Sequence, residues 1–302
     1  RFLQPNLAIL TLVSQDHYSN HRSLEATAAE KSRLAHAAFA NGGTAFINVD
    51  DPLLAPLAAF APEQTVTYGE HPDAHYRAVN IRTSDQGRLL FDCLHQGEST
   101  PFDIAFLGRH FVVSALAAIA CAHHQGLPMA ALAGRAARYQ QLEGRCSLHA
   151  LPDQRLYACD TVKAPFATLE LAFALTRLFP NASRRTIVLG KLSDYPGAQS
   201  PRVNQAYRLA RQYADRVIFF GELESRIKAS DEDLAQGRVL RATTLEALDI
   251  LLQETAMPGE VIVLKGSGKV DKLQQIVPRS GQANETQEPL HGLYRAPDTF
   301  SR

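Results

Sequence analysis

The feature that most constrains the fold is a regular alternation of apolar segments and amphipathic helices after residue 148. The apolar segments have the length and β-branched content of buried strands, and they are 155–160, 185–190, 216–221, 237–242 and 260–266. Stretches with helical periodicity lie at 166–179, 203–214 and 244–255. Strands that alternate with helices form βαβ units, whose crossovers make the strands parallel. We therefore predict an α/β domain with a mostly parallel sheet.

The carboxyl ends of these predicted strands indicate where a ligand would bind. In open α/β sheets, ligands bind in the crevice outside the carboxyl ends of the strands. Asp160, Gly190, Gly221 and Lys265 fall at these ends. This is a prediction of position, and it does not identify the ligand.

The first half of the chain has a less regular pattern, which predicts a second α/β unit with an antiparallel insertion. A helix at 23–41 separates the apolar strand segments 7–13 and 44–52. From about 65 to 107, short segments with alternating apolar residues are divided by turn residues, as in antiparallel strands. Two further helices are predicted at the end of this half, at 112–126 and 129–140.

Composition excludes several classes of protein. Of the 302 residues, 45% are hydrophobic and 21% are charged, as in globular proteins with buried cores. Basic and acidic residues balance at 31 each, so there is no basic field for nucleic acid or an anionic membrane. No apolar run approaches the length of a membrane span. The four cysteines form no CxxC pair and no secretory segment is present, which favours a reducing, cytoplasmic location.

Both ends of the chain differ from its interior. The sequence begins RFLQPNLAILTLVS, without an initiator Met, and enters a buried-strand pattern almost at once. We therefore expect that residue 1 lies inside a domain and that a segment precedes it. Residues 281–302 are polar and rich in turn residues, which predicts a tail.

Several motifs, in order along residues 6–278, resemble those of the Mur ligase family. They are DHYSNHRSLEATAAEKSRL, AFINVDDP, FLGRHFVVSALAAIACAHHQG, LEGR, YACDTVKAPFATLELAFAL, TIVLGKLSDYPGAQS and VIVLKGSGKVDKLQQIV. The string GRHFVVSALAA is most similar to MurF members, which join a dipeptide to a UDP-muramyl-tripeptide; ligases that add glutamate to folate share the same core motifs. The resemblance implies part of a central Mur ligase domain at 1–143, a Rossmann-like C-terminal domain at 144–280 and the tail at 281–302.

The resemblance implies a metal site in the first domain. His17, in the D-H motif, would be a ligand of a Mg²⁺ ion that bridges the acyl phosphate and the ATP phosphates. Lys31 corresponds to the lysine that many members carbamylate, and a carbamate presents the oxygen atoms that a hard cation prefers. Both residues are therefore expected to be catalytic.

The resemblance also implies nucleotide and substrate contacts. Arg145 and Asp160 would contact the nucleotide, as would His110 and Ser114 in the segment GRHFVVS. Lys265 and Ser267, in KGSG, would lie near the site of the incoming amine. Asp160 also has an alternative structural role, as the N-cap of a helix that begins near residue 163.

The activity implied is ATP-dependent formation of an amide bond. ATP phosphorylates a carboxylate, here a UDP-sugar-peptide or another carboxylate, and an amino acid or dipeptide then attacks the acyl phosphate. Cations stabilise the negative charge of the transferred phosphoryl group and of the tetrahedral intermediate. The cofactors implied are ATP and Mg²⁺, and Gly144 marks the predicted hinge.

Departures from the family pattern leave other functions open. The family's Gly-rich phosphate loop, of GxxGKT type, lies upstream of the D-H motif and has no counterpart in this sequence. Phe111 and Ser114 stand where the family has asparagines. One hypothesis is a ligase whose upstream segment supplies the loop; another is a degenerate domain that lost ATP and serves as a binding or assembly subunit with a protein partner. A third is an unrelated nucleotide- or sugar-binding protein that uses LKGSGK at 264–269.

Overall fold

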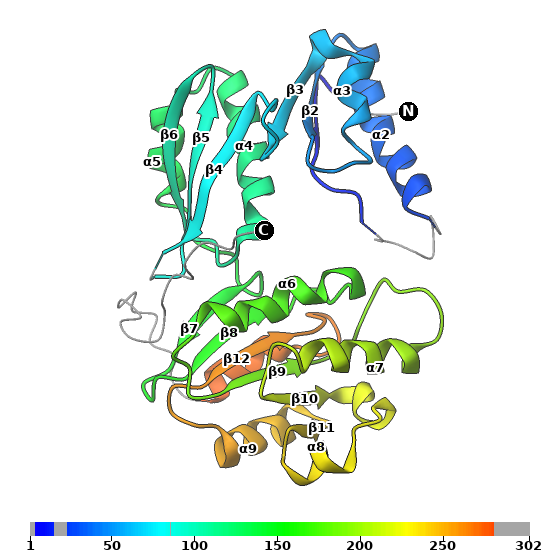
Figure 1. The fold of residues 1–302 in the computed structure, drawn as a ribbon, viewed down its shortest axis with the longest axis vertical. Coiled ribbons are helices and arrows are strands. Elements are labelled where there is room, and N and C mark those ends of the chain that lie inside the picture. The colour runs from blue at the N-terminus through cyan, green and yellow to red at the C-terminus, as the bar shows by residue number, and fades with distance from the viewer. Residues whose placement is uncertain (1–3, 15–22, 85, 281–302) are drawn as a thin grey trace. The chain divides into compact units, whose positions relative to one another are not determined.

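The computed structural model describes residues 4–14, 23–84 and 86–280, which form two compact units (Figure 1). The first unit comprises Arg1–Thr83, Arg88–Ala105 and Arg109–Gln140, and the second comprises Ser84–Gly87, Phe106–Gly108 and Gln141–Arg302. Both units are α/β, as the sequence predicts.

The first unit is built on a six-stranded sheet in the order β1-β2-β3-β4-β5-β6. The strands are β1 (Leu7–Leu10), β2 (Thr44–Asn48), β3 (Thr65–Gly69), β4 (Tyr76–Thr83), β5 (Leu89–His95) and β6 (Glu98–Ile104). β1, β2 and β3 are parallel, whereas β4, β5 and β6 form an antiparallel meander. The sequence predicts the antiparallel insertion from residue 65, but β3 belongs to the parallel part. β3 pairs with β2 in parallel and is largely buried. The alternation of apolar residues along a strand does not indicate which strand it will pair with.

Helices cover both faces of the first sheet. The helices are α2 (Leu24–Ala40), α3 (Pro56–Phe60), α4 (Val112–His124) and α5 (Met129–Ala136). α2 begins after Ser23, whose side chain caps the helix by accepting the backbone N–H of Ala26. Its alanines at 28, 35 and 38 are buried against β1 and β2, where small side chains permit close packing. On the other face, His124 of α4 packs its ring edge on Phe46 of β2.

The second unit contains a six-stranded sheet in the order β11-β10-β9-β12-β8-β7. The strands are β7 (Ser147–Ala150), β8 (Leu156–Asp160), β9 (Arg185–Leu189), β10 (Arg216–Phe220), β11 (Val239–Ala242) and β12 (Val261–Lys265). The five strands predicted from the sequence are parallel, with β12 inserted between β8 and β9. β7, which the sequence pattern did not indicate, adds an antiparallel edge to β8.

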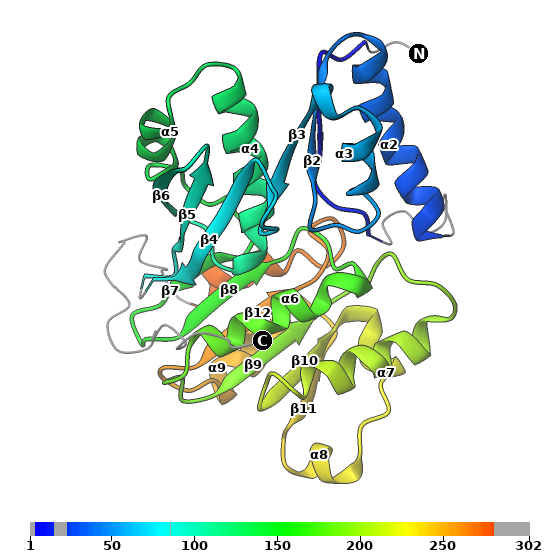
Figure 2. The same cartoon turned by 45° about the horizontal axis from the view of Figure 1, so that its top comes forward.

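The helices of the second unit divide between the two faces of its sheet (Figure 2). They are α6 (Leu169–Phe173), α7 (Gln199–Ala210), α8 (Asp231–Ala235), α9 (Leu245–Thr255) and α10 (Ile276–Arg279). On one face, Tyr207 of α7 packs on Phe219 of β10. On the other, Leu248 and Leu252 of α9 join a cluster with alternate residues of the strands. Both faces are thus buried, as a continuous apolar strand pattern predicts.

The helix predicted at 166–179 is interrupted. Only α6 is α-helical, and short 3₁₀ turns, Phe166–Thr168 and Ala174–Leu178, flank it. The Oγ1 atom of Thr176 lies 2.8 Å from the carbonyl oxygens of both Phe173 and Tyr213, so its single O–H donor is shared between them and competes with the helical backbone pattern. Among the helices that the structure describes, none has the length and apolar character needed to cross a membrane.

A buried charge network closes the end of the second sheet opposite the carboxyl edge. Glu260 is fully buried and accepts hydrogen bonds from the guanidinium groups of Arg216, at 2.8 Å, and Arg184, at 2.7 Å. The hydroxyl of Thr186 also donates to Glu260. Burial lowers the pKa of Arg216, and the carboxylate opposes that shift. A buried ion pair of this kind needs both partners, because a lone buried charge is costly.

We predict that Arg216→Met destabilises the protein by about 3–5 kcal/mol, because it removes one partner of a buried ion pair. Arg33→Met is the matched control, since Arg33 pairs with Glu30 on the surface and its side chain is 74% exposed. The control is expected to change the free energy of unfolding by less than about 0.5 kcal/mol. Equilibrium urea unfolding of the three proteins measures both effects, and equal effects would contradict the prediction.

Candidate functional site

The first unit has a polar site at the carboxyl ends of β1, β2 and β3. Three side chains hold the backbone that leaves β1. Asp51 accepts the backbone N–H of residue 13 at 2.6 Å, Asn48 donates to the carbonyl of residue 11 at 2.7 Å, and the Lys31 ammonium donates to the carbonyl of residue 12 at 2.8 Å. The position after β1 is therefore fixed by contacts from β2, its following loop and α2. His17, predicted to lie here, falls outside the described residues.

A second group of contacts fixes the loop after β3. The carboxylate of Asp50 accepts the backbone N–H groups of Glu70, at 2.7 Å, and His71, at 3.0 Å. Glu70 forms an ion pair with Arg109. Gly69 is required at this point, because a Cβ atom there would lie 2.6 Å from a carboxylate oxygen of Asp50. The strand ends of this sheet are thus held in one arrangement by charged side chains.

The described residues at this edge do not by themselves fit a Mg²⁺ ion. The carboxylate of Asp50 and that of Asp51 already accept backbone N–H groups. Lys31 donates a hydrogen bond, and an ammonium group cannot coordinate a cation. Only a carbamate on Lys31 would convert it into an oxygen donor.

His110 and Ser114 lie at the start of the α4 region. His110 is in the 3₁₀ turn Arg109–Phe111, and its ring lies 4.3 Å from that of Phe111, centroid to centroid. Ser114 is on the exposed side of α4. Their nucleotide contacts stay predictions.

In the second unit, the structure brings together two residues that the sequence singled out separately. Asp160 ends β8 and Lys265 ends the neighbouring β12, and the two are opposite each other in the parallel register. The Lys265 ammonium forms a 2.5 Å ion pair with the Asp160 carboxylate and donates to the carbonyl of Lys163 at 2.8 Å. Its side chain is only 4% exposed. Lys265 thus fixes the carboxyl ends of both strands.

The carboxylate of Asp271 links two loops at the same edge. It accepts the backbone N–H of Lys191, after β9, at 2.8 Å and that of Ser267, after β12, at 2.7 Å. Gly190 and Gly266 permit this approach, because a Cβ atom at either position would lie within 2.7 Å of an Asp271 carboxylate oxygen. Burial raises the pKa of Asp271, and the two backbone hydrogen bonds oppose that shift. The predicted substrate residue Ser267 therefore belongs to a rigid loop.

A cavity of about 570 Å³ opens beside this carboxylate, at the carboxyl ends of β9, β10 and β11. Its lining includes charged groups of both signs and the edge of β10: Lys191, Phe220, Gly221, Glu222, Thr243, Leu245, Glu246, Val270, Asp271 and Lys272. The position agrees with the general rule for ligands of open α/β sheets. The cavity has the size of a small-molecule site.

Arg145 lies in the segment that leads into β7. It is exposed, and its carbonyl accepts from the side chain of Gln141 at 2.6 Å. The neighbouring Gly144 has a positive φ of 73°, and its carbonyl accepts the backbone N–H of Thr161 at 2.9 Å. The structure therefore places the Gly-Arg segment against the residue that follows Asp160.

Comparison with known proteins shows that the chain is similar to Mur ligases. Residues 1–122 match the family model of the Mur ligase middle domain. The match covers less than half of the chain, and the relatives that extend along most of its length are also Mur ligases. Along most of its length the chain is also similar in sequence to individual Mur ligases. It is 27% identical to the UDP-N-acetylmuramyl-tripeptide synthetase of Deinococcus radiodurans, in an alignment of 284 residues that covers 89% of this chain. It is 26% identical to the UDP-N-acetylmuramate–L-alanine ligase of Xylella fastidiosa over 92% of the chain.

The solved structures agree on the fold. MurF from Acinetobacter baumannii superposes on 92% of the chain with a TM-score of 0.75 and 18% identity. MurF from Thermotoga maritima, solved in complex with ADP, superposes on 91% with a TM-score of 0.72 and 16% identity. The chain spans 55% and 61% of the two sequence relatives and 60% and 61% of these two structures. It is therefore similar to only part of each of these proteins.

Sequence reasoning did not identify Asp271 as the residue that joins two loops at the carboxyl edge of the second sheet. Asp271 lies six residues after Lys265, within the motif VIVLKGSGKVDKLQQIV, but the sequence analysis assigns it no role. A signal was present, however. Glycines at 190 and 266, each directly after a parallel strand, indicate a close approach by another group, and an acidic residue nearby can accept the exposed N–H groups of such loops.

We predict that Gly190→Ala destabilises the second unit by about 1–3 kcal/mol, because its Cβ atom would overlap the Asp271 carboxylate. The added Cβ atom would lie 2.3 Å from a carboxylate oxygen of Asp271, so one of the two must move. Gly134→Ala, in α5, is the control: nothing lies within 4 Å of the added atom, and a helical Ala is expected to stabilise by about 0.5–1 kcal/mol. Urea unfolding checks the sign of each change in the free energy of unfolding. Stabilisation by Gly190→Ala would contradict the close contact between the Asp271 carboxylate and the backbone at residue 190.

Asp271 also predicts a pH dependence of stability. Because its pKa is raised in the folded state, the folded protein binds this proton more tightly than the unfolded chain. Its contribution to stability is therefore complete below the ordinary pKa of 3.8 and declines as pH rises through the raised value. We expect Asp271→Asn to remove this decline, so that the variant gains stability relative to the parent protein with rising pH. Asp73→Asn, at a 91% exposed side chain, should show no such trend.

Proposed function

We propose that the protein containing this chain is an ATP-dependent ligase that joins a carboxylate to an amine through an acyl phosphate. The observation that carries the proposal is the Mur ligase middle domain match over residues 1–122, which spans β1, α2 and the polar strand ends described above. Sequence similarity to two differently named Mur ligases across most of the chain supports it. The ADP complex of a protein with the same fold supports a nucleotide cofactor.

In this proposal the chain supplies part of the catalytic apparatus. Lys31 is held at the end of β1, where a carbamate would present oxygen atoms to a Mg²⁺ ion, for which we propose His17 as a further ligand. The ion would neutralise charge on the phosphoryl group when bound. The remaining segment of the protein would supply the phosphate-binding loop, because backbone amides of such a loop bind the β- and γ-phosphates.

Residues of the second unit would hold the nucleotide and the incoming amine. We assign the nucleotide contacts to Arg145, which is exposed, and to the Asp160 region. For the first unit, considered by itself, we propose His110 and Ser114 as nucleotide contacts, as the family resemblance implies. The ion pair of Lys265 leaves its ammonium little access to a ligand, so it would act by holding the segment after β8, at Asp160 and Lys163, against the end of β12.

The substrate class proposed is a UDP-sugar or UDP-sugar-peptide carboxylate with an amino acid or dipeptide. The relatives' names differ on the pair that is joined. One ligase is named for UDP-N-acetylmuramate and L-alanine, another for a UDP-muramyl dipeptide and 2,6-diaminopimelate, and a similar structure for D-alanyl-D-alanine. These three pairs form the substrate panel for a test.

We predict that the full-length gene product forms ADP only when one carboxylate and its matching amine are both present. Lys31→Ala should lower that rate by about 100-fold or more, because a site that stabilises transition-state charge is lost. Arg33→Ala is the matched control, since Arg33 lies on the same helix and its side chain is 74% exposed. Coupled measurement of ADP release with the three pairs gives both values.

Two outcomes would overturn the proposal. Full activity of Lys31→Ala would remove Lys31 from the mechanism. A folded full-length protein that neither binds ATP by calorimetry nor forms ADP would favour a degenerate Mur ligase domain, whose partner would then be a protein. Omission of bicarbonate tests the carbamate separately, because only the carbamylated form depends on it.

A further inference from the structure

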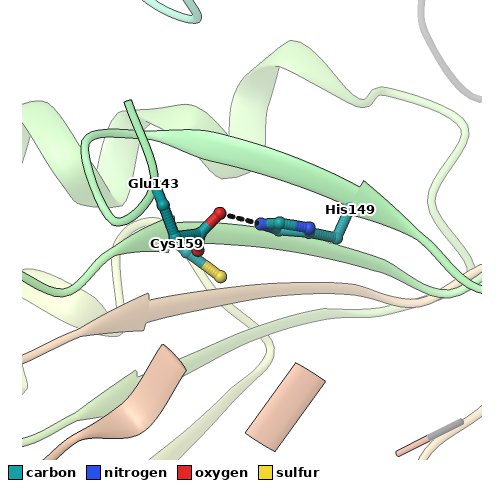
Figure 3. Close-up of side chains that lie close together, drawn as sticks. All are labelled: Glu143, His149 and Cys159. Atoms are coloured by element: carbon teal, nitrogen blue, oxygen red, sulfur yellow. Dashed lines mark ion pairs between the residues drawn. The ribbon is translucent and has the colours of Figure 1, made fainter. Parts of the chain in front are cut away.

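Three side chains with metal-ligating atoms meet beside the segment that leads into β7. Glu143 lies in that segment, His149 is on β7 and Cys159 is on the neighbouring β8. One ligand atom from each lies within 4.8 Å of the other two. Figure 3 shows the Glu143 carboxylate and the His149 ring directed at each other, with the Cys159 sulfur beside them. All three residues belong to the second unit.

The surrounding contacts hold this group in place. The Nε2 atom of His149 lies 3.1 Å from a carboxylate oxygen of Glu143. The hydroxyl of Ser147, a buried residue between them in sequence, lies 3.1 Å from the same Nε2 atom and 3.2 Å from the other Glu143 oxygen. It also accepts the backbone N–H of Gly144 at 3.0 Å, so residue 143 is tied to the strand edge.

The donor set has the chemistry of a zinc site. Zn²⁺ binds cysteine sulfur, histidine nitrogen and carboxylate oxygen in tetrahedral geometry. A thiolate and a carboxylate together carry two negative charges, which a divalent cation neutralises. With bonds of about 2.0–2.3 Å, tetrahedral ligand atoms lie roughly 3.3–3.8 Å apart. The His149–Glu143 separation is already close to this value, and the sulfur needs only a small side-chain movement.

From this geometry we propose that Glu143, His149 and Cys159, to which the proposed ligase mechanism assigns no role, form a zinc-binding site at the edge of the second sheet. Burial is graded across the three ligands. The Cys159 residue is fully buried, the His149 side chain is 23% exposed and the Glu143 side chain is 57% exposed. The ion therefore enters from the Glu143 side, and water takes the fourth position.

The site would have a mechanical consequence for the chain. Glu143 directly precedes Gly144, whose carbonyl bonds the residues after β8. A metal bond to Glu143 would add a strong link between this segment and β8, because metal ligation joins residues that the backbone alone holds weakly. The segment that leads from the first unit into β7 would then be fixed at one more point.

Titration of the tag-free, reduced full chain with Co²⁺ tests the proposal, because cobalt replaces zinc and reports its ligands by absorption. We expect one equivalent to bind, with visible bands of tetrahedral cobalt and a near-ultraviolet thiolate-to-cobalt band. Zn²⁺ should abolish these bands, since it binds such sites more tightly. His149→Gln and Glu143→Gln should each weaken binding about tenfold or more.

Cys159→Ser should remove the thiolate band. Cys121→Ser and His95→Gln are the matched controls: these two residues lie in the first unit, so the variants should leave the titration unchanged. If Cys159→Ser does not fold, His149→Gln and Glu143→Gln still show whether cobalt binds at this site. No thiolate band in the parent protein, or a band that persists in Cys159→Ser, would overturn the proposal. Neither outcome depends on ligase activity.

Discussion

The carboxyl edge of the second sheet depends on one buried carboxylate. Parallel strands end with free backbone groups and loops that must be held in place, and Asp271 binds two of these loops through their N–H groups. Glycines at 190 and 266 allow the carboxylate to approach the backbone. The Lys265–Asp160 ion pair fixes the next two strand ends in the same way. Of these groups, Asp271 lines the cavity, so the carboxylate that joins the two loops also forms part of the cavity wall.

The fold could be predicted from the sequence where local pattern and tertiary environment agree. The five parallel strands of the second unit are buried on both faces, so their apolar runs are unambiguous. β3 was assigned to the antiparallel part because its alternation resembles that of its successors, yet it pairs with β2. β7 was missed because a four-residue edge strand carries little pattern. Both errors concern pairing, which depends on distant partners.

Residues of the candidate site are predictable where they belong to a motif or end a predicted strand. Lys31 follows from the resemblance alone, Asp160 and Lys265 follow also from the strand ends, and the structure adds what each side chain contacts. It changes the interpretation of Lys265, whose ammonium is engaged with Asp160. Strand pairing brings the Glu143–His149–Cys159 group together, and spacing along the chain does not indicate it. For Asp271, the glycines at 190 and 266 are the sequence signal.

The segment 141–147 is where these arguments meet. Its backbone bonds the residues after β8, its Ser147 hydroxyl bonds both Gly144 and Glu143, and its Arg145 side chain faces solvent. For Arg145 to contact a nucleotide as proposed, its side chain must be exposed and its backbone must hold a defined position. If the segment were flexible, binding would have to order it, which costs conformational entropy. Anchoring residues 143, 144 and 147 on the sheet removes most of that cost in advance. The rigid attachment of the segment is therefore what makes Arg145 suitable for the role proposed.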